Sequence, residues 1–178
     1  MATALLSRNT NFGSIRLKGH IGTGGFSDVY EGFTAAGQRV AVKVLRSATD
    51  QVSSNSARFA REQEVLKRLD SRGAARLVDA DLDNDPPWIA SEFIDGISLS
   101  ELIQRDGPLN NELTQALIFS LAGVVKNVHN AGIAHRDISP NNIILGADGP
   151  VLIDFGSSRL ESYDSQTGSR LFVGTDGY

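Results

Sequence analysis

The stretch His135–Leu145, HRDISPNNIIL, places one carboxylate, two adjacent amides and a proline between an apolar helix-like run and an apolar strand-like run. Asp137 and Asn142 stand five residues apart in it, on what the flanking patterns predict to be a loop. A second strand-like run, VLIDFGSSR, follows and contains the Asp-Phe-Gly triplet Asp154–Gly156. Three oxygen-bearing side chains therefore lie at the ends of two neighbouring predicted elements.

Asp137, Asn142 and Asp154 offer the hard oxygen ligands that suit Mg2+ bound to phosphates. Their joint occurrence indicates phosphoryl transfer. Any one of them could instead cap a turn, which is the usual role of Asp and Asn in loops.

Composition excludes several other kinds of function. The chain has 178 residues, a formal net charge of -4, no Cys and three His, and its basic residues do not cluster. These numbers argue against nucleic-acid binding, disulfides and a zinc site. The N-terminus lacks the pattern of a signal peptide, and no apolar run approaches the ~18 residues needed to cross a bilayer. We therefore predict a cytoplasmic protein with no membrane segment.

Strand-like and helix-like segments are segregated along the chain, which predicts an α+β fold with a boundary near residues 95–98. The first half combines short strands with one helix, and the second half begins with two helices. The predicted strands are residues 14–22, 27–34, 38–45, 75–81 and 87–94, and the predicted helices are residues 53–70, 98–104 and 110–132.

The glycines of GHIGTGGFSDVY, at positions 22, 24 and 25, lie between two predicted strands. Glycines there allow the backbone to approach a ligand closely and offer N–H groups to phosphate oxygens. A hairpin can also need glycine for its own geometry. The segment is neither a P-loop nor a Rossmann fingerprint, because no Gly-Lys-Ser/Thr follows and a strand stands where a helix would begin.

Strand alternation in RVAVKVL places Ala41 and Lys43 on the face opposite the valines. A lysine at mid-strand either extends to water or meets an anion. In the following helix, Glu62 falls at the centre of the apolar stripe, whereas Glu64 points nearly opposite. A buried acid needs a partner, so we predict a Lys43–Glu62 pair.

The ordered set of glycine loop, strand lysine, helix glutamate, H-R-D-x-x-x-x-N and D-F-G resembles the eukaryotic-type Ser/Thr protein kinase domain, over residues 12–178. The resemblance implies a two-lobe fold. Residues 1–11 would be an N-terminal extension, and residues 12–95 a complete N-lobe with a five-stranded antiparallel sheet and one helix. Residues 96–178 would be the start of a helical C-lobe, ending within the activation segment.

The resemblance also implies ATP and Mg2+ as cofactors and proteins carrying Ser or Thr as substrates. Asp137, Lys43 and Glu62 would be catalytic, Asn142 and Asp154 would bind the metal, and Thr167, Ser169 and Thr175 would belong to the activation segment. The residues expected to bind ATP are Ile21, Gly22, Thr23, Gly24, Gly25, Phe26, Ser27, Val29, Ala41, Lys43, Glu92, Ile94, Ser98 and Ile144.

The sequence departs from the family pattern at three places. Ser27 replaces the third glycine of the loop, and Ser139 stands where these kinases usually have a lysine that contacts the γ-phosphate. The chain also ends before the A-P-E element, so we expect an exposed apolar patch that a further C-terminal region or a partner would cover. Two alternatives stay open: a small-molecule phosphotransferase of the aminoglycoside or choline kinase type, and a non-catalytic nucleotide-binding fragment.

Overall fold

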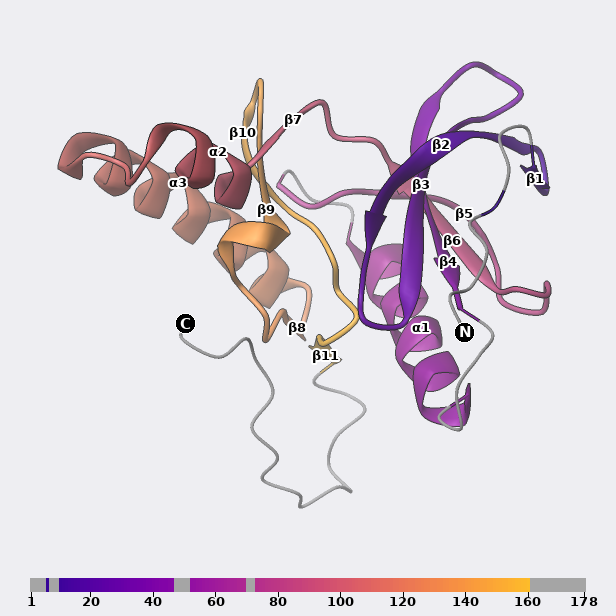
Figure 1. Ribbon diagram of the computed structural model, residues 1–178. Helices are drawn as coiled ribbons and strands as arrows, with labels where there is room; N and C mark the ends of the chain where they lie inside the picture. Colours follow the sequence, from indigo (N-terminus) through magenta and orange to yellow (C-terminus); the bar gives the residue numbers. More distant parts are fainter. Residues whose placement is uncertain (1–5, 7–9, 47–51, 70–72, 161–178) are drawn as a thin grey trace. The chain divides into compact units, whose positions relative to one another are not determined.

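The computed structural model describes residue 6 and residues 10–46, 52–69 and 73–160 of the chain (Figure 1). The chain forms two compact units. The first comprises residues 1–63 and 77–93, and the second comprises residues 64–76 and 94–178. A curled antiparallel sheet dominates the first unit, and helices with short hairpin strands make up the second, so the predicted α+β class is confirmed.

The sheet of the first unit contains all five predicted strands and one more. Its strands are β1 (Asn11–Phe12), β2 (Ile15–Thr23), β3 (Ser27–Phe33), β4 (Arg39–Leu45), β5 (Leu77–Asp81) and β6 (Trp88–Glu92). The order across the sheet is β1-β2-β3-β4-β6-β5, with antiparallel pairing throughout. The unpredicted β1 has only two residues. It pairs with β2 because Gly13, at φ 55°, turns the chain back.

The period-two pattern of β4 decides which face of the sheet is buried. Val40, Val42 and Val44 point into a core that also contains Trp88 and Phe12, whose rings lie 6.0 Å apart. Burying each valine contributes about 1.5–3 kcal/mol. The intervening side chains of β4 are only partly buried, so this strand offers its opposite face to other contacts.

Helix α1 (Val52–Arg68) begins close to the predicted start. Phe59, Val65 and Leu66 form its buried stripe, with Glu62 buried among them. Lys67 and Arg68 lie in its last turn, where positive charge complements the helix dipole. The predicted amphipathic pattern, including the inward-facing acid, is present.

Besides the last residues of α1, the described part of the second unit contains two helices and five short strands. They are β7 (Gly96–Ser98), α2 (Leu99–Asp106), α3 (Asn111–Asn130), β8 (Ile133–Ala134), the 3-10 turn η1 (Pro140–Asn142), β9 (Ile143–Gly146), β10 (Gly149–Leu152) and β11 (Arg159–Leu160). Strands β10-β9-β7 form one sheet and β11-β8 another. The segment after α1 also joins this unit, because Ala74 bridges to Leu152.

Both helices of the second unit have side-chain caps. Ser98 caps α2 in a reciprocal capping box with Glu101. Asn110 caps α3 by accepting a hydrogen bond from the Leu113 N–H at 2.9 Å, and Gly132, at φ 71°, follows its last turn. The predicted start and end of the long helix are therefore confirmed.

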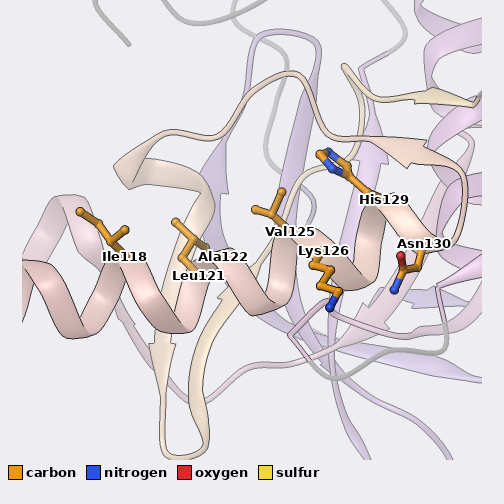
Figure 2. A pocket seen from close by; sticks show the side chains of 7 residues that line it. All are labelled: Ile118, Leu121, Ala122, Val125, Lys126, His129 and Asn130. Atoms are coloured by element: carbon orange, nitrogen blue, oxygen red, sulfur yellow. The ribbon is translucent and has the colours of Figure 1, made fainter.

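Helix α3 buries less of its apolar surface than its sequence pattern predicts. Val124 and Val128 are buried, whereas Leu113 is exposed and Phe119 is 85% exposed. A shallow, mostly apolar groove runs along the helix (Figure 2). It is lined by Ile118, Leu121, Ala122, Val125, Lys126, His129 and Asn130. None of the helices in the described ranges combines the length and hydropathy needed to cross a bilayer.

Candidate functional site

The glycine loop joins β2 to β3 in the first unit. Ile21, Gly22 and Thr23 complete β2, and the Gly24 N–H closes the turn by donating to the Ser27 carbonyl at 2.8 Å. Ser27 then opens β3 and is buried. The loop is thus a tight hairpin in which these predicted ATP-binding residues are consecutive.

The glycines of this loop are not explained by the geometry of the hairpin. Gly22, Gly24 and Gly25 all lie outside the left-handed region that favours glycine. Apart from its chain neighbours, a Cβ added at Gly22 or Gly25 would meet no atom of the described residues within 4 Å. Neither backbone conformation nor packing therefore requires glycine at these two positions. Close approach of the backbone to a ligand is then the remaining physical reason for glycine at positions 22 and 25.

Lys43 and Glu62 form the predicted ion pair within the first unit. Lys43 Nζ lies 2.9 Å from Glu62 Oε1 and 2.7 Å from Oε2. Lys43 stands directly opposite Val29 on β3, which in turn stands opposite Gly22 on β2. The Lys43 ammonium also lies 5.9 Å from the centroid of the Phe26 ring. A cation held by a carboxylate is therefore in register with the glycine loop.

The remaining predicted residues of the first unit lie on β4 and β6. Ala41 stands opposite Ser91, and Val40 stands opposite Glu92, the last residue of β6. Phe93 follows, and its ring lies 3.7 Å from the Arg39 guanidinium carbon. Opposite residues of paired strands point to the same side of a sheet, so Val29, Ala41 and Lys43 share one face.

Asp137 and Asn142 meet in the second unit, within the HRDISPNN loop. Asn142 Nδ2 donates to the Asp137 backbone carbonyl at 2.9 Å and to Asp137 Oδ2 at 3.0 Å. The turn η1 makes this possible, because the Asn142 N–H donates to the Ser139 carbonyl at 2.9 Å and folds the loop back. Since Nδ2 is committed to Asp137, the amide oxygen of Asn142 points away from that carboxylate.

Asp154 is tied to the same loop through its neighbour. The Ile153 N–H donates to the Asn142 carbonyl at 3.0 Å, and Asp154 Oδ1 accepts from the Gly156 N–H at 3.2 Å. Asp154 and Arg136 have φ angles of 60° and 67°. Within the described ranges they are the only residues other than glycine in the left-handed region.

His135 holds the loop and the Asp-Phe-Gly segment together. Its ring lies 4.6 Å from the Phe155 ring, Nε2 lies 3.1 Å from the Ile153 carbonyl, and Nδ1 accepts from the Asp137 N–H at 3.3 Å. Burial lowers the pKa of His135 below its ordinary value, although the Ile153 carbonyl and nearby carboxylates oppose the shift. The imidazole is accordingly neutral near pH 7, which suits a structural role.

The oxygen donors fit a magnesium ion. Asn142 supplies an amide oxygen and Asp154 a carboxylate, and the backbone hydrogen bond from Ile153 keeps the two residues adjacent. Within the ranges that the structure describes, no three His, Cys, Asp or Glu side chains gather into a metal-binding group. Two protein ligands nevertheless suit Mg2+, which usually takes one or two carboxylate ligands and completes its shell with water and phosphate oxygens.

Other predicted residues have structural partners or lie outside the described residues. Ser98 stands opposite Ile144 in the β7–β9 pair, but its hydroxyl is occupied by the capping box with Glu101. The S-x-x-E spacing of Ser98 and Glu101 indicates this cap, which the family resemblance alone does not assign. Ile94 begins the second part of the second unit. Thr167, Ser169 and Thr175 lie outside the described residues.

Ser139, which replaces the expected lysine, is only 3% exposed.

One contact of the glycine loop is not indicated by the local sequence pattern. The side chain of Arg46, just after β4, donates to the carbonyls of Gly24 and Gly25 at 2.6 Å and 2.7 Å. Side-chain periodicity cannot indicate such a contact, because the acceptors are backbone carbonyls that only the fold of the hairpin brings to Arg46.

Comparison with known proteins agrees with this geometry. The family described as Protein kinase domain matches residues 15–178. The chain is 36% identical over 166 residues to the probable serine/threonine-protein kinase PkwA of Thermomonospora curvata, covering 93% of this chain and 22% of that protein. It is 34% identical over 160 residues to the serine/threonine-protein kinase PknL of Mycobacterium tuberculosis, covering 89% and 40%. The chain therefore spans less than half of these relatives.

Among solved structures, the crystal structure of the M. tuberculosis PknI kinase domain resembles the chain with a TM-score of 0.73 and 27% identity. The match covers 85% of this chain and 62% of that one. Ordered motifs, paired side chains and these matches lead to one conclusion: the chain belongs to the protein kinase domain family.

Proposed function

We propose that the protein is an ATP-dependent, Mg2+-requiring Ser/Thr protein kinase that acts in the cytoplasm. The observation that carries the proposal is the Lys43–Glu62 pair, in register with glycines that neither packing nor backbone conformation requires. A buried ion pair at mid-strand contributes little to stability, so its presence beside the glycine loop favours a phosphate-binding role. The names of the relatives PkwA and PknL support Ser and Thr hydroxyls as acceptors.

In the proposed reaction, residues of the first unit bind ATP. Backbone N–H groups of the glycine loop would receive the phosphate oxygens, and Lys43, oriented by Glu62, would neutralise the α- and β-phosphates. Val29 and Ala41 share the face of Lys43 and would contact the adenine ring. Glu92, the last residue of β6, would offer its backbone carbonyl to the adenine edge.

Residues of the second unit would handle the acceptor and the metal. Asp137 would accept the proton as the hydroxyl oxygen bonds to the γ-phosphorus and the bond from that phosphorus to the ADP oxygen breaks. Asn142 orients Asp137 through Nδ2 and would hold Mg2+ through its amide oxygen, together with Asp154. Bound Mg2+ would neutralise charge on the phosphate oxygens.

The predicted roles of Ile94, Ser98, Ile144 and the activation-segment residues remain part of the proposal. A further C-terminal region or a partner that covers the apolar surface of α3 also belongs to it. Ser139 keeps the small-molecule phosphotransferase as the second candidate, because the loop lacks the lysine usual in protein kinases and the serine is buried. The identity of the acceptor distinguishes the two.

The test is a transfer assay with radiolabelled Mg-ATP on the full chain. The acceptors are a Ser- and Thr-containing protein, the same protein with blocked hydroxyls, an aminoglycoside and choline. We expect label on the first acceptor only, and its loss in Asp137→Asn. The matched control is Asp148→Asn, an exposed acid in the β9–β10 turn.

Label on the aminoglycoside or choline alone would establish the second candidate and contradict ours. Nucleotide binding without transfer to any acceptor would support a non-catalytic role. Equal loss of transfer in Asp137→Asn and Asp148→Asn would contradict the specific role of Asp137.

A further inference from the structure

Arg46 contacts three successive carbonyl oxygens of the glycine loop. Its Nη2 donates to Gly24 O at 2.6 Å and to Gly25 O at 2.7 Å. Its backbone N–H donates to Phe26 O at 3.0 Å. One residue, placed directly after the strand that carries Lys43, therefore binds the whole tip of the hairpin.

A buried carboxylate lies beside the same guanidinium. Asp28 Oδ1 lies 3.7 Å from Arg46 Nη1, and the Asp28 side chain is only 9% exposed. The Thr23 hydroxyl donates to the same Oδ1 at 3.0 Å, and His20 Nε2 lies 3.0 Å from that hydroxyl. Asp28 thus links the end of β2, the start of β3 and Arg46.

These contacts fix the direction of the peptide groups. In a trans peptide, the carbonyl of one residue and the N–H of the next point in opposite directions. The carbonyls of Gly24 and Gly25 face Arg46, so the N–H groups of Gly25 and Phe26 face away from it. Successive N–H groups with a common direction form an anion-binding site.

We propose that Arg46, held by Asp28, is a positioning residue that sets the glycine loop for the phosphates of ATP. This inference rests on the proposed function, since it assumes that the loop binds phosphate. Arg46 acts through the loop backbone and its planar fork spans two carbonyls and a carboxylate, a geometry that a lysine cannot reproduce. Preorganisation of this kind strengthens binding by reducing the entropy lost when the loop is ordered.

The test compares Arg46→Ala and Arg46→Lys with the native chain, and Arg61→Ala on the exposed side of α1 serves as the matched control. Affinity for Mg-ATP and for adenosine is measured by calorimetric titration. Loss of two hydrogen bonds to a charged group should weaken ATP binding roughly tenfold. Adenosine has no phosphates, so its affinity should not change. Arg46→Lys should stay close to Arg46→Ala if positioning, rather than charge, is responsible.

A second measurement needs no nucleotide. Hydrogen exchange of the Gly24 amide, which donates to the Ser27 carbonyl, should be faster in Arg46→Ala and in Asp28→Asn than in the native chain and the control. Native-like exchange in both variants would contradict the conclusion that Arg46 and Asp28 hold the glycine loop in place. Equal weakening of ATP and adenosine, full ATP affinity in Arg46→Ala, or full rescue by lysine would overturn the positioning role. A native chain that binds no ATP would instead refute the proposed function, whatever the exchange rates show.

Discussion

Replacing Glu62 by Gln is the sharpest test of the Lys43–Glu62 pair. The two side chains are 14% and 5% exposed, and the carboxylate accepts two hydrogen bonds from Lys43 Nζ. Breaking a fully buried ion pair costs about 3–5 kcal/mol, because the remaining charge is left uncompensated. Lys43 is partly reached by solvent and Gln can still accept one hydrogen bond, so we expect about 2–3 kcal/mol.

The free energy of unfolding is measured by urea denaturation. With a slope of about 2 kcal/mol per M, the expected loss lowers the midpoint by about 1 M. The control is Glu64→Gln on the same helix, where the carboxylate is 43% exposed and pairs with Arg68. Exposed pairs of this kind contribute about 0.3–0.5 kcal/mol, so the control should remain close to the native midpoint.

A double variant separates stability from function. Lys43→Met with Glu62→Leu removes both charges and retains similar volume, and such replacements are often neutral or stabilising. We expect this variant to recover most of the stability lost in Glu62→Gln and to lose ATP affinity. If Glu62→Gln unfolds at the native midpoint, or if the double variant stays as unstable as Glu62→Gln, the account of an uncompensated buried charge is wrong.

Three further predictions concern the second unit. Burial lowers the pKa of His135, so the unfolded chain binds the proton more readily than the folded chain. The free energy of unfolding should therefore decrease as the pH falls below about 6.5, by at most about 1.4 kcal/mol per pH unit. Urea midpoints of His135→Phe between pH 5 and 7.5 should lack this decrease. A Cβ at Gly96 would lie 2.4 Å from the Leu145 carbonyl oxygen, so Gly96→Ala should lower the free energy of unfolding by about 1–3 kcal/mol in urea denaturation. Gly146 lies on the opposing strand, and the nearest contact of a Cβ added there is at 3.5 Å, so Gly146→Ala should lower it less. Asn142→Ala should weaken ATP binding in calorimetric titrations with Mg2+ but not in EDTA; an equal effect in both would contradict a metal role for the amide.

The Lys43–Glu62 pair could be predicted because two periodicities point to the same conclusion. Strand alternation separates Lys43 from the valines of β4, and helical spacing places Glu62 on the buried face of α1. A buried charge of either sign is costly without the other. The main strands and helices could be predicted for the same reason, since each is long enough to show its period.

The rest depends on tertiary contacts that leave no local pattern. Strands β7, β8 and β11 have two or three residues each, fewer than an alternating pattern needs, and form only against their partners. On α3 the apolar stripe predicts burial of Leu113, but its exposure depends on which elements cover the helix. Arg46 follows a strand without any unusual spacing, and only the hairpin geometry brings the loop carbonyls to it.

The left-handed backbone at Arg136 and Asp154 affects how this domain should be engineered. For residues with a side chain, this conformation costs about 1–2 kcal/mol, and glycine avoids that cost. A library selected for thermal resistance alone would therefore enrich glycine at both positions. At Asp154 the same substitution would remove the carboxylate that the proposed reaction needs. Under the proposed function, variants of this chain must be ranked by turnover as well as by melting temperature, because the two criteria favour different residues there.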